Sequence, residues 1–220
     1  MSAIATAVPP LPGSIHYFAE LYAPAPRRAL LRAVHALEAE VRASLKAELD
    51  HGVAHVRLEW WAQEAERTAA GAPAHPLVAE LGTYAGAAPL GAALSDWVLA
   101  ARAELAGDLL APEVRAVHAA HAVAARFALI AALLGADPAA ARAAARTDVE
   151  ALAAAPQAPL RPLLVWTMLE LARARRGDPA PPERPATTRR GTFGDNWHAW
   201  RAARAADAGR AHQLLRKLQP

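Results

Sequence analysis

The sequence predicts an all-α protein, and three features of its composition support that fold class. Hydrophobic residues make up 54% of the 220 residues, and alanine supplies the largest share of them. Aromatic residues amount to only 5%, whereas strands are enriched in aromatic and β-branched residues. Over most of the chain, apolar residues recur every three or four positions, as they do in a helix with one buried face. We therefore expect closely packed helices in a single domain.

The first two helices are predicted from their capping residues. Ser14 suits the N-cap of a short helix over 15–22, which has to end before Pro24. Pro26 suits the first turn of a long helix that ends at Gly52. We expect this long helix to bury an apolar stripe that consists of Leu30, Val34, Leu37, Val41, Leu45 and Leu49.

Further helices are expected between the glycine and proline residues that follow. Their ranges are 53–71, from Pro76 onward, 92–107, 112–135, 138–155, 160–177 and 197–218. The helix over 112–135 is so poor in polar residues that we expect it to be buried on most sides. The chain then divides into a flexible N-terminus (1–13), a helical domain (14–177), a proline-rich linker (178–196) and a basic amphipathic C-terminal helix (197–220).

The composition also excludes several classes of protein. The chain has no cysteine, which excludes disulfides, thiolate catalysis and cysteine-ligated metals. Its first residues lack the cationic and apolar regions of a secretory signal. The longest continuous apolar run, 127–136, is shorter than the ~20 residues that span a bilayer. We expect a cytoplasmic protein that is either soluble or peripheral on the inner membrane face.

The charge is unevenly distributed along the chain. Residues 1–160 hold 12 Lys/Arg and 16 Asp/Glu, whereas residues 161–220 hold 12 and 5. A basic C-terminal end suits an anionic lipid surface, an acidic protein partner or nucleic acid, or is simply a solubilising tail. In the last helix one face is apolar, and we predict that it either folds back on the domain or lies on an anionic membrane. That face consists of Trp197, Trp200, Ala208, Ala211, Leu215 and Leu218.

Four charged side chains follow one another at every fourth position of the long helix: Glu38, Arg42, Lys46 and Asp50. Residues four apart stand over one another on a helix, so two ion pairs can form, each stabilising the helix by ~0.2–0.5 kcal/mol. On this spacing alone, a solvent-exposed ladder of salt bridges is favoured over the floor of a binding site.

Histidines give two weaker candidates. His51, His55 and Glu59 have metal-ligand spacing on a continuous helix, but we expect Gly52 to break the helix between the two histidines and favour a polar rim. His118 and His121 are three apart with no carboxylate nearby in sequence, so we expect buried, hydrogen-bonded histidines.

An ordered set of segments resembles the squalene/phytoene synthase family. The segments are "SIHYFAELYAP" (14–24), "RRALLRAVHALEAEV" (27–41), "VRLEWWAQEAE" (56–66) and "GAPAHPLVAEL" (71–81), with fainter likeness over 120–137 and 160–176. The resemblance implies a helical isoprenoid-synthase-like bundle around a central cavity. It also implies a packing signature made of Arg57, Trp60, Trp61, His75 and Pro76. Adjacent helical residues point about 100° apart, so we expect both tryptophans to be buried against different elements.

The resemblance implies that the metal-binding residues have been lost. Setting 33–46 against the family's first aspartate-rich motif places Arg42, Ala43 and Lys46 on its three aspartates. The second motif should fall near 140–155, where only Asp148 and Glu150 remain. Mg²⁺ requires hard oxygen ligands, which a guanidinium or an ammonium cannot supply.

The same alignment places other side chains along the cavity that the family fold would enclose. Arg126 stands where the family has a glycine, which puts a substrate channel in doubt. The residues expected to line the cavity are Tyr17, Phe18, Glu38, His121 and Asp148.

Three interpretations follow. The first is a catalytically inactive family member that has a binding or assembly role and needs no cofactor. Its partners would be an isoprenoid or lipid ligand, a protein, or an anionic membrane contacted through the C-terminal helix. The second is an active head-to-head prenyltransferase of carotenoid, squalene or hopanoid biosynthesis that uses Mg²⁺. The third is a helical adaptor or nucleic-acid binder, although the arginines come without a recognisable groove-reading motif, which disfavours nucleic acid. The missing aspartates favour the first.

Overall fold

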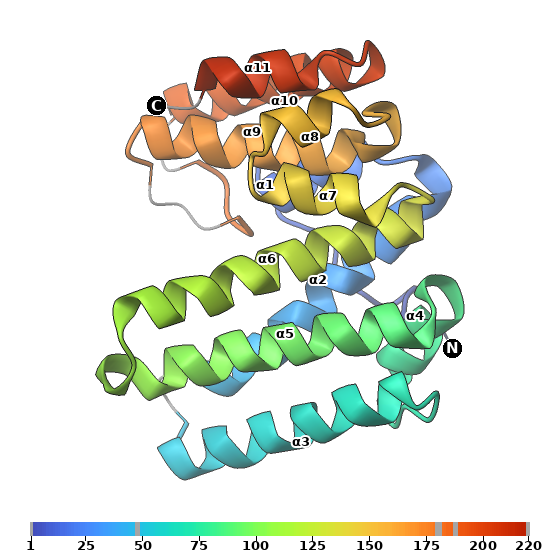
Figure 1. The fold of residues 1–220 in the computed structure, drawn as a ribbon, viewed down its shortest axis with the longest axis vertical. Helices are drawn as coiled ribbons and strands as arrows, with labels where there is room; N and C mark the ends of the chain where they lie inside the picture. The colour runs from blue at the N-terminus through green and yellow to red at the C-terminus, as the bar shows by residue number, and fades with distance from the viewer. Residues whose placement is uncertain (1, 47–48, 179–181, 187–188, 219–220) are drawn as a thin grey trace.

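The computed structural model describes residues 2–46, 49–178, 182–186 and 189–218. In these residues the regular structure is helical, and the only β-type pairing is an isolated bridge between Ser14 and Pro185. The all-α prediction is therefore confirmed (Figure 1).

Eleven α-helices are found in the described part of the chain. They are α1 Ile15–Leu21, α2 Arg28–Arg42, α3 His51–Ala69, α4 Pro76–Ala85, α5 Ala87–Ala106, α6 Pro112–Leu134, α7 Pro138–Ala145, α8 Val149–Ala153, α9 Arg161–Arg175, α10 Arg189–Asp207 and α11 Ala211–Leu218.

The helices form a stack with α3 at one end and the C-terminal helices α10 and α11 at the other (Figure 1). At one end α3 packs against α5, and α5 against α6. At the other end α10 packs against α9, which is also covered by α1. α2 contacts α5 and α6, and α7 contacts both α6 and α9, so these helices join the two ends. The largest side chains of the shared core include Leu31, Leu37, Leu94, Phe127, Ile130 and Trp166, each under 2% exposed.

Local capping explains several helix ends. The Ser14 hydroxyl accepts the N–H of Tyr17 at the start of α1, as predicted. Asp137 caps α7 by accepting the N–H groups of Ala139 and Ala140. α6 ends at Gly135, whose φ of 69° is a left-handed conformation that glycine adopts without strain.

The predicted long helix over the second segment is interrupted. α2 ends at Arg42 and continues as the 3₁₀ turn Ala43–Leu45, after which Lys46 is extended. α3 then begins at His51, and the Asp50 carboxylate accepts the N–H of Gly52 as its N-cap. Gly52 therefore lies in the first turn of a helix and breaks none. The predicted salt-bridge ladder is wrong, because Lys46 and Asp50 are not on the helix that carries Glu38.

α6 is buried over only half of its length. Phe127 and the residues up to Leu133 are almost entirely buried, apart from the part-buried Ala132, whereas Val114 and Val117 are 42% and 52% exposed. The prediction that this helix is buried on most sides is therefore wrong for its N-terminal half. By length and composition α6 could cross a membrane, as the core helices of soluble proteins also could.

Two segments that were predicted to be flexible or extended contact the bundle within the described residues. Ile4 is buried, and its N–H donates to the Glu80 carboxylate at 3.1 Å, so this part of the predicted flexible N-terminus is ordered against α4. In the predicted linker, the Pro182 carbonyl accepts the N–H groups of Ile15 and His16. Residues 179–181 and 187–188 of that segment lie outside the described residues.

The predicted C-terminal helix is two helices. α10 begins at Arg189, within the predicted linker, and a turn at Gly209 (φ 66°) separates it from α11. α10 buries a row of small residues against α9: Ala199, Ala202, Ala203 and Ala206. Ala211 and Leu215 of α11 are fully buried as well. The tail therefore folds back on the domain, which was one of its two predicted positions.

The segments "VRLEWWAQEAE" (56–66) and "GAPAHPLVAEL" (71–81) are joined by one buried carboxylate. Glu64 of α3 is 0% exposed and accepts the N–H groups of Ala74 and His75, at 2.9 and 2.8 Å, while Arg67 donates to its other oxygen. This contact places the His75 ring 5.3 Å from the ring of Trp61. No pattern in the sequence indicated this role for Glu64.

The two adjacent tryptophans of α3 differ in burial, which allows a direct test of their roles. Trp61 is 5% exposed and Trp60 is 40% exposed, so the prediction that both are buried is wrong for Trp60. We expect Trp61→Ala to lower the free energy of unfolding by ~3–5 kcal/mol because it leaves a cavity in the core. Trp60→Ala is the matched control and should cost under about 1 kcal/mol. Urea unfolding measures both, and equal losses would contradict the assignment.

Candidate functional site

A cluster of polar and aromatic side chains, three of them buried and three part-buried, lies where α1, α2, α6 and α9 meet. We call it the interior cluster, and each of the four helices contributes one or two side chains from its inward face. Its members are His16, His35, Glu38, Arg126, Trp166 and Glu170.

An ion pair between α2 and α6 lies at the centre of the interior cluster. Arg126 Nη1 lies 3.1 Å from both carboxylate oxygens of Glu38, and the two side chains are 9% and 16% exposed. The guanidinium carbon also lies 4.3 Å from the centre of the Trp166 ring, which is within the range of a cation–π interaction. A desolvated charge pair of this kind is costly to break, because either charge alone would remain buried.

Two histidines stack beside the same tryptophan. The rings of His16 and His35 are 4.1 Å apart and nearly parallel, at 6°, and the Trp166 ring is 4.8 and 5.2 Å from them. Within the part of the chain that the structure describes, neither ring nitrogen of His35 has a hydrogen-bond partner. Burial, and then the nearby Arg126 charge, lowers the pKa of His16 to about 4. Burial, then His16 and Arg126, lowers the pKa of His35 well below 6.5. Both imidazoles are therefore neutral at pH 7.

Glu170 completes the interior cluster from α9, one turn after Trp166. Burial raises the pKa of its carboxyl group, and the Arg126 charge opposes that rise. Two carboxyl groups, Glu38 and Glu170, thus lie within the influence of the Arg126 charge, and Glu38 is the one that forms an ion pair with it.

The structure does not show the central cavity expected from the resemblance. Of the side chains predicted to line it, only Glu38 belongs to the interior cluster. Phe18 is a core residue at 2% exposure, and the part-buried Tyr17 packs edge-on against it. His121 is exposed on α6, and Asp148 is the N-cap of α8, where it accepts the N–H of Ala151.

The positions that correspond to the family's first motif offer no metal ligands. Arg42 is exposed and pairs with Glu104 of α5 at 3.1 Å. Ala43 is part-buried in the turn after α2, and Lys46 is exposed. Within the described residues, no three His, Cys, Asp or Glu side chains are grouped so that they could hold a metal ion. These residues do not fit Mg²⁺, which needs an oxygen donor set.

The histidine candidates also lack a metal site. His51 and His55 lie on the first turns of α3 with their Nε2 atoms 3.1 Å apart, both exposed. Glu59, the third member of that predicted set, pairs with Arg102 at 2.6 Å instead. His118 is part-buried and His121 is exposed, so the prediction that both are buried is wrong.

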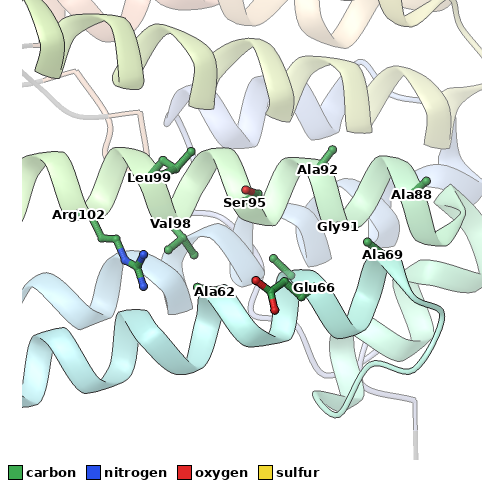
Figure 2. Close-up of a pocket in the computed structure, with 11 residues that line it drawn as sticks. Ala62, Glu66, Ala69, Ala88, Gly91, Ala92, Ser95, Val98, Leu99 and Arg102 are labelled. Carbon is green, nitrogen blue, oxygen red and sulfur yellow. The ribbon is translucent and has the colours of Figure 1, made fainter.

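Two shallow hollows lie on the surface between α3 and α5. The first has a volume of about 450 Å³ and a floor of small residues, with Glu66, Leu99 and Arg102 at its edges (Figure 2). The helices approach closely there, since a Cβ added to Gly91 would lie 2.9 Å from the Ala69 nitrogen. The second hollow shares Arg102 with the first and includes His55, Val56 and Glu59. Neither hollow brings together an acid, a base and a nucleophile.

Sequence reasoning missed four members of the interior cluster: His16, His35, Trp166 and Glu170. A polar residue within the apolar stripe of a helix could have revealed them. His35 is such a residue, because it lies between the apolar residues Leu31, Val34 and Leu37 of α2.

Comparisons with protein-family models, curated proteins and solved structures found no match to this chain.

The two stacked histidines make the free energy of unfolding depend on pH. The pKa of His16 in the folded chain, about 4, and that of His35 lie below the ordinary value of 6.5. Below pH 6.5 the unfolded chain therefore binds protons that the folded chain does not, and the free energy of unfolding falls as the pH falls. The raised pKa of Glu170 acts in the opposite direction, since that carboxyl group favours the folded state as it becomes protonated.

We expect His35→Gln to flatten this dependence between pH 6.5 and pH 4, because glutamine cannot bind the proton. Denaturant unfolding at a series of pH values measures the slope. His121→Gln removes an exposed imidazole from α6 and is the matched control. A slope in His35→Gln equal to that of the unmodified chain would contradict the assignment.

The ion pair of the interior cluster can be tested by comparing single and double variants. Arg126→Met leaves Glu38 buried without a partner, and we expect it to lower the free energy of unfolding by ~3–5 kcal/mol. Replacing both, as Glu38→Leu with Arg126→Met, should recover most of that loss, because no buried charge then remains. A double variant as unstable as Arg126→Met would show that packing, and not the unpaired carboxylate, dominates.

Proposed function

We propose that this chain is a catalytically inactive relative of the squalene/phytoene synthases that acts by binding and not by prenyl transfer. Its all-helical fold suits that relationship. So does the contact of Glu64 with the backbone of Ala74 and His75, since it gives a physical reason for the segments "VRLEWWAQEAE" and "GAPAHPLVAEL" to occur together.

The observation that carries the proposal is the interior cluster. A prenyl transferase of this kind needs an apolar cavity for the isoprenoid chain and carboxylates at its rim for the metal ions that neutralise the diphosphate. Here the centre of the bundle is occupied by Trp166, Phe127 and the pair of Glu38 with Arg126.

The remaining acidic residues near the two motif regions have structural partners. Arg42 pairs with Glu104, Asp148 caps α8, and Glu150 pairs with Arg216 of α11. A carboxylate that already accepts a helix N–H or an arginine is poorly placed to bind Mg²⁺. The active-enzyme alternative therefore requires a different set of ligands from the one that the resemblance implies.

In a binding role, the contacts with the partner would be made by residues on the surface of the protein. The partner classes that fit are an isoprenoid or lipid, a protein, or a membrane surface, and the chain would act in the cytoplasm or at the inner membrane face. Nucleic acid is the less favoured partner, because no groove-reading motif accompanies the basic residues.

The proposal predicts that the protein releases no pyrophosphate. The purified full-length chain, given Mg²⁺ and farnesyl or geranylgeranyl diphosphate, should match a no-enzyme control, because neither motif supplies a metal-binding carboxylate set. An active squalene synthase assayed under the same conditions is the positive control. Metal-dependent formation of squalene or phytoene would overturn the proposal in favour of a working enzyme.

A further inference from the structure

α10 exposes two large aromatic side chains next to each other. Trp197 and Trp200 are 52% and 44% exposed, although the opposite face of the same helix is buried against α9. Their rings stack on each other, with centres 5.2 Å apart and planes at 24°. Exposed tryptophans are uncommon unless they contact something, because burying one removes a large apolar area from water.

Several basic side chains of α10, of the turn after it and of α11 form no ion pair within the described residues. The guanidinium of Arg204 lies 5.3 Å from the centre of the Trp200 ring. Among the described residues, no carboxylate forms an ion pair with Arg201, Arg204, Arg210 or Lys217. The acidic residues of α10 are already engaged in ion pairs with arginines of α9 and of the segment after it.

Asp195 is fully buried and pairs with Arg173, at 2.8 Å, and with Arg176. Asp207 pairs with Arg161 at 3.2 Å on the side of α10 that faces α9. Arg216 of α11 pairs with Glu150. Within the described residues, Arg201, Arg204, Arg210 and Lys217 thus carry positive charges that no ion pair offsets, and their electrostatic complement is an anionic surface.

We infer that the face formed by Trp197, Trp200, Arg201 and Arg204, here called the α10 face, docks on an anionic lipid membrane. Arginines attract acidic headgroups, and tryptophan side chains favour the boundary between headgroups and acyl chains. The inference goes beyond the proposed function because it names a surface and its partner, and it holds whether or not the chain is catalytic.

The geometry of the rings favours lipid over nucleic acid. Stacking on bases requires a free aromatic face. Here the two rings cover each other, and Arg204 covers part of Trp200. Both side chains nevertheless stay about half exposed, and the headgroup region is where amphipathic tryptophan rings are enriched.

The α10 face is narrower than the amphipathic helix predicted from the sequence. Ala211 and Leu215, two members of the predicted apolar face, are buried in the fold. The structure therefore leaves a compact contact that can meet a membrane without unfolding the C-terminal helices. Because the contact involves few side chains, membrane binding should be reversible and sensitive to salt.

The test measures co-sedimentation of the full-length protein with vesicles. Phosphatidylcholine vesicles with and without phosphatidylserine separate anionic from neutral surfaces, and a single-stranded oligonucleotide is the competing partner. The variants are Trp197→Ala with Trp200→Ala, and Arg201→Gln with Arg204→Gln. The matched control, Trp60→Ala with Arg57→Gln, removes an exposed tryptophan and an exposed arginine from α3.

We expect binding to phosphatidylserine vesicles at low salt, loss of it at high salt, and weak binding to neutral vesicles. Each arginine removed should weaken binding about five-fold, and the double tryptophan variant should weaken it at both salt concentrations. The control should bind like the unmodified chain.

Unfolding midpoints close to that of the unmodified chain show that the α10 variants remain folded. Any one of four results would overturn the inference. They are equal binding to both vesicle types, no binding at low salt, an equal loss of binding in the α3 control, and binding to the oligonucleotide but not to vesicles. None of these outcomes depends on pyrophosphate release, so the two proposals fail separately.

Discussion

The buried pair of Glu38 and Arg126 is the constraint on which the arrangement of the helices depends. It joins α2 to α6, and the contact of Arg126 with Trp166 adds α9. Two charges removed from water must stay within hydrogen-bond distance of each other, so the three helices can slide or rotate only a little before a large desolvation cost appears. Apolar contacts between alanines restrict the relative position of two helices less, because one methyl group can replace another at little cost in free energy. In a core this rich in alanine, the ion pair supplies specificity that side-chain shape alone provides poorly.

This use of the interior limits what the protein can do there. A centre that contains a charge pair, two neutral histidines and a tryptophan is filled, and each polar group in it depends on its neighbours. Opening room for an isoprenoid chain would separate charges that are stable only together. The same contacts that stabilise the bundle thus argue against chemistry at its centre, and they leave the exposed parts of α3, α6 and α10 for contacts with other molecules.

The sequence predicted what is decided locally. The fold class, the caps at Ser14 and Asp137 and the end of α6 at Gly135 all depend on a few neighbouring residues. It failed where distant residues compete for the same group. Glu38 can pair with Arg42 four positions later, but its actual partner is 88 positions away, and a desolvated pair outweighs an exposed one. Spacing could not reveal that partner, nor that half of α6 extends beyond the core. Asp50 likewise caps the next helix, because an N-cap carboxylate satisfies backbone donors that a salt bridge with Lys46 would leave unpaired.

The position of α1 has a consequence for the order in which the chain folds. α1 packs mainly on α9, and the N–H groups of Ile15 and His16 donate to the carbonyl of Pro182. A ribosome releases residue 16 long before it adds residue 182, so during synthesis the first helix emerges without the surface that it covers. Neighbouring helices such as α3, α5 and α6 can associate as they appear, but the stacking of His16 on His35 and Trp166 forms only when the C-terminal third arrives. Until then Phe18 and Ile15 are exposed apolar side chains on a tethered segment, which makes nascent chains the form of this protein that most needs a chaperone.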